Sequence, residues 1–138
     1  MDSLASRIKK AKRVYLIGNG GSSANASHIC NDLETAGVRA CVMNEATKSA
    51  WENDFPHDYV FSKWLMLHGE AGDLLIALSG SGKSKNILNA VSSARLIGMD
   101  VHCEYGAEQG FDMQSSEERQ IWLGHELMRE LGKTKCTK

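Results

Sequence analysis

The sequence contains two short apolar runs that each lead into a glycine-rich loop, and this feature constrains the fold most. Val14–Ile17 precede residues 18–21 (Gly-Asn-Gly-Gly), and Leu74–Leu78 precede residues 79–84 (Ser-Gly-Ser-Gly-Lys-Ser). Uninterrupted apolar runs of this length are typical of strands buried on both faces of a parallel sheet. Such a sheet needs helices on both faces, so we expect an α/β fold.

The rest of the chain alternates between strand and helix patterns. Further strands are expected at 39–43 and 100–103, and helices at 24–35, 58–69, 84–97 and 117–131, with Ser22 as the N-cap of the first helix. Residues 44–57 and 104–116 are polar and are expected to be irregular. The pattern predicts a three-layer α-β-α sandwich with a parallel sheet of four to five strands. Ligands of such folds bind outside the carboxyl ends of the strands, where both glycine-rich loops are expected to lie.

The net charge, the lengths of the apolar runs and the cysteine spacing argue against several classes of protein. The formal charge of −1 gives no reason to expect nucleic acid or an anionic membrane as partner, and the basic segment Lys9–Arg13 is interpreted as a solvated leader to the first strand. No apolar run reaches transmembrane length, and Met1–Lys12 lacks the apolar core of a signal peptide, so we expect a cytoplasmic protein. The four cysteines show no CxxC spacing, which favours free thiols over a zinc–cysteine site.

Two segments resemble nucleotide-binding motifs but lack residues that these motifs require. The first glycine-rich loop lacks the third glycine of the dinucleotide fingerprint, because Ser23 stands there, and the second expected strand does not end in an acid. The second loop ends like a nucleotide P-loop, but Ala77 occupies the position of its first glycine. We therefore expect no nucleotide cofactor.

What remains in the second loop is a hydroxyl-rich turn at a helix N-terminus. Ser79, Ser81 and Ser84 offer hydroxyl donors, and the intervening glycines allow backbone N–H groups to approach an anion. The helix dipole adds favourable charge. A capped helix behind a flexible turn would need fewer serines, so phosphate binding is the favoured interpretation.

These segments together resemble the SIS (sugar isomerase) domain family, and within it the isomerases of heptose phosphates. The resemblance is carried, in order along nearly the whole chain, by residues 18–22, His28, residues 53–55 (Asn-Asp-Phe), residues 72–75, the loop 79–84 and residues 117–125. It implies a single SIS domain over residues 1–138, shortened at the N-terminus and before the last helix. The implied activity is an aldose–ketose isomerisation through an enediol(ate), most closely of sedoheptulose 7-phosphate to D-glycero-D-manno-heptose 7-phosphate.

The resemblance also implies roles for individual residues. The serines at 79, 81 and 84 match those that hold the substrate phosphate, and the residues that match sugar-contacting positions are Asn19, Ser22, Asp54 and Glu117. Some members bind Zn²⁺ at the positions matched here by His28, Asp32, Glu117 and His125, with the acidic residue of the first pair as base and the last histidine as acid. Two departures stand out, since Asp32 replaces a glutamate and Glu117 replaces a glutamine.

The spacing of these residues is compatible with that chemistry. His28 and Asp32 are four residues apart and share a helix face, and Glu117 and His125, eight apart, do so as well. Two imidazoles and two carboxylates are suitable zinc ligands. Each residue alone also has a structural interpretation, for example acids near a helix start, which the dipole favours. The joint match to the family pattern favours the functional interpretation.

Two functions stay open: an isomerase, or a non-catalytic module that binds a phosphosugar. In either case we expect a homo-oligomer, with a tetramer favoured, because a small sheet with site residues on its edge helices needs neighbours to close the pocket.

Overall fold

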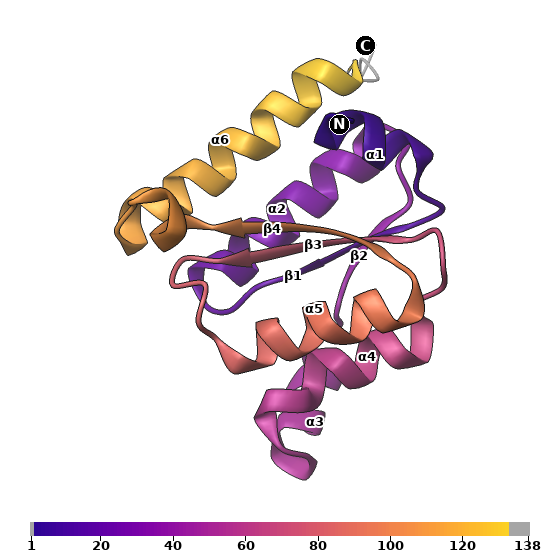
Figure 1. The fold of residues 1–138 in the computed structure, drawn as a ribbon, viewed down its shortest axis with the longest axis vertical. Helices are drawn as coiled ribbons and strands as arrows, with labels where there is room; N and C mark the ends of the chain where they lie inside the picture. The colour runs from indigo at the N-terminus through magenta and orange to yellow at the C-terminus, as the bar shows by residue number, and fades with distance from the viewer. Residues whose placement is uncertain (1, 133–138) are drawn as a thin grey trace.

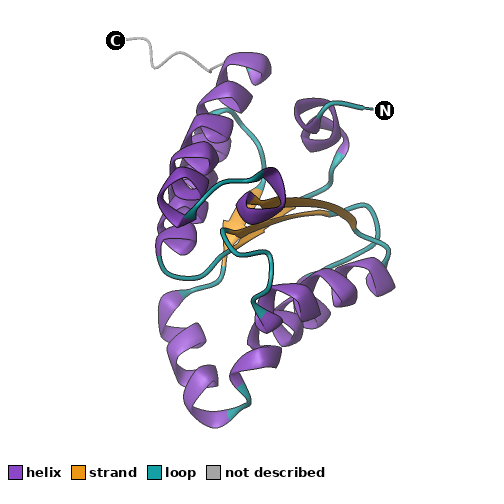
Figure 2. Cartoon of the chain, turned by 60° about the vertical axis from the view of Figure 1, so that its left-hand side comes forward, coloured by secondary structure: helices purple, strands orange, loops and turns teal. Residues whose placement is uncertain are grey.

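Four parallel strands form one sheet with helices on both faces, as Figures 1 and 2 show. The computed structural model describes residues 2–132. The elements, in chain order, are α1 (Leu4–Lys10), β1 (Val14–Ile17), α2 (Gly21–Thr35), β2 (Ala40–Val42), α3 (Glu45–Asp54), α4 (Val60–His68), β3 (Leu74–Ser79), α5 (Lys85–Ile97), β4 (Asp100–Tyr105) and α6 (Met113–Leu131), with short 3₁₀ turns at His57–Tyr59 and Gly106–Gln109.

The strands lie in the order β2-β1-β3-β4. Val14 is in register with Ala40 of β2 and Leu74 of β3, and Leu74 is in register with Asp100 of β4. All residues of β1 and β3 are buried, as their uninterrupted apolar runs predict. The three-layer sandwich and its parallel sheet are thereby confirmed, with four strands in the described part of the chain.

Alternating side chains of the strands build two cores. Tyr15 and Leu75 face α4 and α5, whereas Leu16 and Ile76 face α1, α2 and α6. In Figure 1, α1, α2 and α6 accordingly lie on one side of the sheet and α3, α4 and α5 on the other. Helices α2 and α6 are neighbours, and this pairing positions much of the candidate site.

Three sequence-based predictions of local structure were wrong. Residues 45–54 form α3 instead of a loop, because the Asn44 side chain caps this helix by accepting hydrogen bonds from the N–H groups of Ala46 (2.9 Å) and Thr47 (3.2 Å). The last helix begins at Met113, since the Asp112 carboxylate accepts the Ser115 N–H (2.7 Å). Ser22 is not an N-cap: the first long helix begins at Gly21, and Ser22 is buried inside its first turn.

Other expectations have mixed outcomes. The segment interpreted as a solvated leader partly belongs to α1, whose Ala5 and Ile8 are buried. Cys30, Cys41 and Cys103 are free thiols, while Cys136 lies outside the described residues. Among residues 2–132 no helix is long and apolar enough to cross a membrane. The cytoplasmic location stays a prediction.

Candidate functional site

The two glycine-rich loops meet at the carboxyl ends of β1 and β3. These strands are adjacent, and the chain continues from β1 to one side of the sheet and from β3 to the other, so a crevice opens between their loops. A small pocket of about 50 Å³ lies there. Its lining comprises Asn19, Ser22, Leu78, Ser79, Gly80, Ser81, Ser84 and Met113. Five of the predicted substrate-binding residues therefore line one pocket, and Met113 joins them from α6 without having been predicted.

The serine loop holds its hydroxyl groups in defined positions. Ser79 Oγ accepts the Gly82 N–H (3.0 Å), and Ser81 Oγ accepts the Lys83 N–H (3.1 Å). A hydroxyl that accepts in this way keeps its own hydrogen for donation. Ser84 is the N-cap of α5, yet its side chain makes no capping hydrogen bond. The pocket thus combines available hydroxyl donors with the positive end of a helix, which is the chemistry of an anion site.

A pair of asparagines joins the two loops. Asn19 Nδ2 donates to Asn86 Oδ1 (3.0 Å), and Asn86 Nδ2 donates to Asn19 Oδ1 (2.8 Å). Asn86 is only 3% exposed and was not singled out from the sequence. Because its side-chain amide is engaged in this way, Asn19 lines the pocket chiefly as part of the link between the loops.

A buried polar network connects the first turn of α2 to α6. Gln120, 1% exposed, donates from Nε2 to Ser22 Oγ (3.0 Å) and accepts from Asn25 Nδ2 (2.8 Å). Asn25 Nδ2 also donates to the backbone oxygen of Glu117 (3.0 Å). Such a network holds α2 and α6 in one relative position, because a buried polar group without its hydrogen-bond partner destabilises the fold. The sequence-based prediction missed Asn25 and Gln120 as parts of this network.

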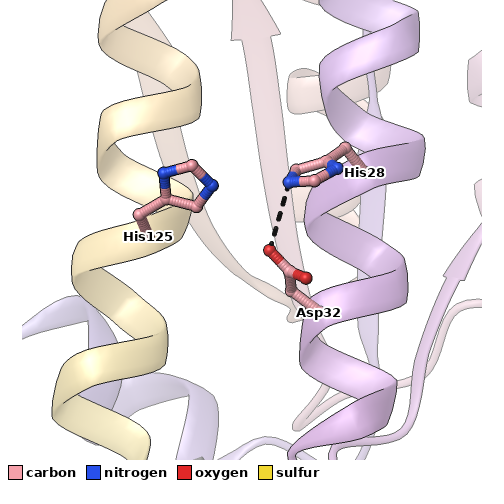
Figure 3. A group of neighbouring side chains, drawn as sticks. All are labelled: His28, Asp32 and His125. Carbon is pink, nitrogen blue, oxygen red and sulfur yellow. Dashed lines mark ion pairs between the residues drawn. The ribbon is translucent and has the colours of Figure 1, made fainter.

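Further along the same helix pair, two histidines and an aspartate converge, as Figure 3 shows. His28 Nε2 lies 3.3 Å from Asp32 Oδ2, and the rings of His28 and His125 are 5.7 Å apart between centroids. One ligand atom from each of the three residues lies within 4.8 Å of the others. The four-residue spacing on α2 and the approach of α6 bring these groups together at the surface.

Gly124 allows that approach. A Cβ atom at this position would lie 2.8 Å from Cγ1 of Ile29, which is closer than packed side chains come. The absence of a side chain lets α6 pack tightly on α2 one residue before His125.

Glu117 and Asp54 lie apart from this group. The Glu117 carboxylate packs over Gly21, where a Cβ would overlap it, and Glu117 precedes His125 by eight residues, or about 12 Å of helix. It faces α2, as its spacing predicts, but near the serine pocket. Asp54 is exposed at the end of α3, where Asn53 Nδ2 donates to its carboxylate (3.2 Å), and it does not line the serine pocket. The roles of both residues stay predictions.

The donor set of the three converging residues fits a divalent cation. Two imidazole nitrogens and one carboxylate oxygen are the set found in catalytic zinc sites, which leave a fourth position open for water or substrate. Ligands about 2.0–2.2 Å from a tetrahedral Zn²⁺ lie closer together than 4.8 Å, so the side chains would have to rotate toward one another to bind one ion. His28 is about half exposed, so an ion could reach the site from solvent.

Comparisons with known proteins agree with this architecture. The sequence model of the SIS domain family matches residues 1–103. A phosphoheptose isomerase from Rhodospirillum rubrum is 37% identical over 75% of this chain and 59% of its own, and one from Yersinia pestis is 35% identical over 88% and 66%. The solved phosphoheptose isomerase of Neisseria gonorrhoeae superposes with a TM-score of 0.84 at 26% identity, covering 92% of this chain and 82% of that one.

This chain spans somewhat less than two thirds of the length of these curated relatives. The family match nevertheless extends over most of its length and includes both glycine-rich loops. On the strength of that match and of the shared fold, this chain belongs to the SIS domain family.

Proposed function

We propose that this chain is an aldose–ketose isomerase acting on a sugar phosphate, most closely on sedoheptulose 7-phosphate, with D-glycero-D-manno-heptose 7-phosphate as product. The observation that carries the proposal is the convergence of His28, Asp32 and His125 on a helix pair whose first turns border the serine pocket. The three relatives named above are phosphoheptose isomerases, and their names support the choice of substrate.

In this proposal the serine pocket binds the phosphate. Hydroxyl groups of Ser79, Ser81 and Ser84 donate to the phosphate oxygens at the N-terminus of α5. Room for only a few water-sized groups suits one end of the substrate, so the sugar extends out of the pocket past Ser22. Glu117, which packs over Gly21, would contact sugar hydroxyls there.

The chemistry needs a base for the proton on carbon and an acid at the carbonyl oxygen. Asp32 would take the proton from the carbon next to the carbonyl, and His125 would donate to the oxygen as the enediol(ate) forms. Asp32 would then return the proton to the former carbonyl carbon while His125 takes the proton of the hydroxyl on the other carbon, so that a new carbonyl forms and both side chains regain their starting protonation. The contact between Asp32 and His28 holds the carboxylate in place during these steps.

Zn²⁺ fits the same residues as a cofactor. His28, Asp32 and His125 would hold it, and Glu117 could join only after a displacement from Gly21. When bound, it would supply Lewis-acid polarisation of the substrate carbonyl in place of the proton from His125, whose ring would then serve as a ligand. Zinc measured by mass spectrometry in the purified protein, and lost from His28→Ala and His125→Ala, would support this role; equal zinc content in the wild type and both variants would contradict it.

The distances along α2 support a homo-oligomer. Ser22 and His28 are six residues apart, or about 9 Å, whereas Ser22 and Asp32 are ten apart, or about 15 Å. A sugar held by its phosphate reaches Asp32 more easily if a second copy supplies one end of the site. We therefore expect an oligomer, with a tetramer favoured, and a single monomeric species in light scattering at micromolar concentration would contradict this.

An isomerase assay with two variants tests the function. Asp32→Asn keeps the shape of the side chain and removes the base, so kcat for sedoheptulose 7-phosphate should fall by about 100-fold or more while the substrate still binds. Ser81→Ala with Ser84→Ala should instead weaken substrate binding and raise KM. Proton NMR follows the aldose signal, and calorimetry measures binding.

The outcomes separate the two candidate functions. If the wild type binds the sugar phosphate but does not turn it over, the chain is a non-catalytic phosphosugar-binding module. The shorter Asp32 in place of the family glutamate is the feature that favours this alternative. Turnover by Asp32→Asn at the wild-type rate would refute the assignment of the base.

A further inference from the structure

A cavity larger than the serine pocket lies away from it. It has a volume of about 380 Å³ and opens where α1 and α2 end and where β1 and β2 begin. Ile8, Val38 and Leu131 contribute apolar surface to it. The serine pocket lies at the opposite end of α2, a helix of 15 residues and about 22 Å, so the two sites are separate. The volume is within the range of small-molecule pockets.

Three basic side chains line this cavity, namely Lys9, Lys12 and Arg39, and no acidic residue does. None of the three forms an ion pair with an acid among residues 2–132. The neighbouring Arg7 and Lys10, by contrast, are paired with Asp100 and Asp2. Among its described lining residues, this cavity therefore has three positive charges and no carboxylate.

The simplest structural explanation is that these cations complement helix C-termini. The last carbonyl groups of α2 are already bonded, however, because Ala36, Gly37 and Val38 donate their N–H groups to Asp32, Glu34 and Leu33 at 2.9–3.1 Å. Gly37 has a φ of +86°, the left-handed conformation that this type of helix end requires. The dipole of α2 still attracts these cations, but this attraction uses no hydrogen bond. The N–H groups of the lysines and the arginine therefore stay available to donate to a ligand.

An adjacent cavity shows where the positive charge is balanced. Lys12 and Arg39 also line a second cavity, of about 330 Å³, to which Glu70 and Asp73 contribute carboxylates. Lys9 lines the larger cavity and not this second one. The excess of positive charge thus lies on the Lys9 side.

We propose that the cavity of Lys9, Lys12 and Arg39 binds a small molecule bearing a diphosphate or an equivalent group with two or more negative charges. Two lysines act as mobile point charges, and the arginine provides a planar fork that binds a phosphate through two N–H groups. The site is independent of the proposed isomerase activity, since it shares no residue with the serine pocket.

Binding of inorganic pyrophosphate tests the proposal. The variant with Ser81→Ala and Ser84→Ala serves as the background, because it weakens the serine pocket as a competing anion site. Calorimetry on this background should give one pyrophosphate per chain. Adding Lys9→Gln, Lys12→Gln and Arg39→Gln should weaken binding by about tenfold or more, since each exposed charge pair contributes a modest share.

A matched control removes the same charge elsewhere. Lys63→Gln, Arg95→Gln and Arg129→Gln change the net charge equally but lie outside the cavity, and they should leave the affinity within about threefold. Unchanged binding in the cavity variant, or an equal loss in the control, would overturn the proposal.

A second measurement covers the case in which the cavity variant does not fold. Titration of pyrophosphate into the background protein should shift the NMR amide signals of Gly37 and Val38, which border the cavity. Binding without shifts at these two residues would equally refute the site.

Discussion

Replacement of Gln120 by alanine should destabilise the protein and loosen the candidate site together. The side chain is 1% exposed and makes two hydrogen bonds, to Ser22 Oγ and from Asn25 Nδ2. Each such bond contributes roughly 0.5–1.5 kcal/mol, so their loss costs about 1–3 kcal/mol. Loss of the buried aliphatic part adds about 1 kcal/mol. We expect the free energy of unfolding to fall by about 2–4 kcal/mol.

Urea denaturation followed by circular dichroism measures this change. Gln120→Met keeps most of the volume and should lose only the hydrogen-bond share, about 1–3 kcal/mol. Gln114→Ala is the matched control, because Gln114 is exposed on the same helix and should change stability by less than about 0.5 kcal/mol. If Gln120→Ala is as stable as this control, the network does not hold α6 against α2, and the reasoning fails.

Three further predictions follow from packing and charge. Gly124→Ala should lower the free energy of unfolding by about 1–3 kcal/mol and weaken any zinc binding, because the added methyl group pushes α6 away from α2; unchanged denaturation and metal titrations would contradict this. Burial opposes ionisation of Glu104, but its hydrogen bonds, led by the one from His102, outweigh burial and lower its pKa. The ionised carboxylate therefore stabilises the folded protein above the unfolded pKa of about 4.3, and this stabilisation is lost as pH falls through the lower folded pKa. Glu104→Gln should therefore flatten the acid limb of the stability–pH curve, and an unaltered limb would count against the assignment. Burial raises the pKa of Cys30 to about 12 and of Cys41 to about 11, so both thiols should react with a disulfide reagent at pH 8 far more slowly than in urea; equal rates would disprove their protection.

The sequence predicted best where a local pattern determines the structure. The limits of β1 agree with its apolar run, and the serine-rich turn leads into α5 as expected. Helix α3 was missed because none of its residues is fully buried, so it lacks the apolar periodicity that identifies helices; Asn44 as N-cap was the one available signal.

Long-range partners could not be predicted from one sequence. Asn86 and Gln120 resemble ordinary polar helix residues, and their partners lie 67 and 98 positions away. The family resemblance supplied His28, Asp32 and His125, and the structure brings these together. The position of Glu117 over Gly21 depends on how α6 is placed along α2, which spacing within α6 alone does not define.

The pairing of α2 with α6 also affects the order in which parts of the protein can fold during synthesis. On a ribosome, His28 and Asp32 emerge early, and the sheet and serine loop can form before residues 113–131 leave the exit tunnel. His125 can reach His28 only when this last helix docks, a contact between residues 97 positions apart along the chain. An incomplete chain would therefore present the serine loop without Met113 of α6, and His28 without the opposing His125, so both parts of the candidate site would be completed only when α6 docks.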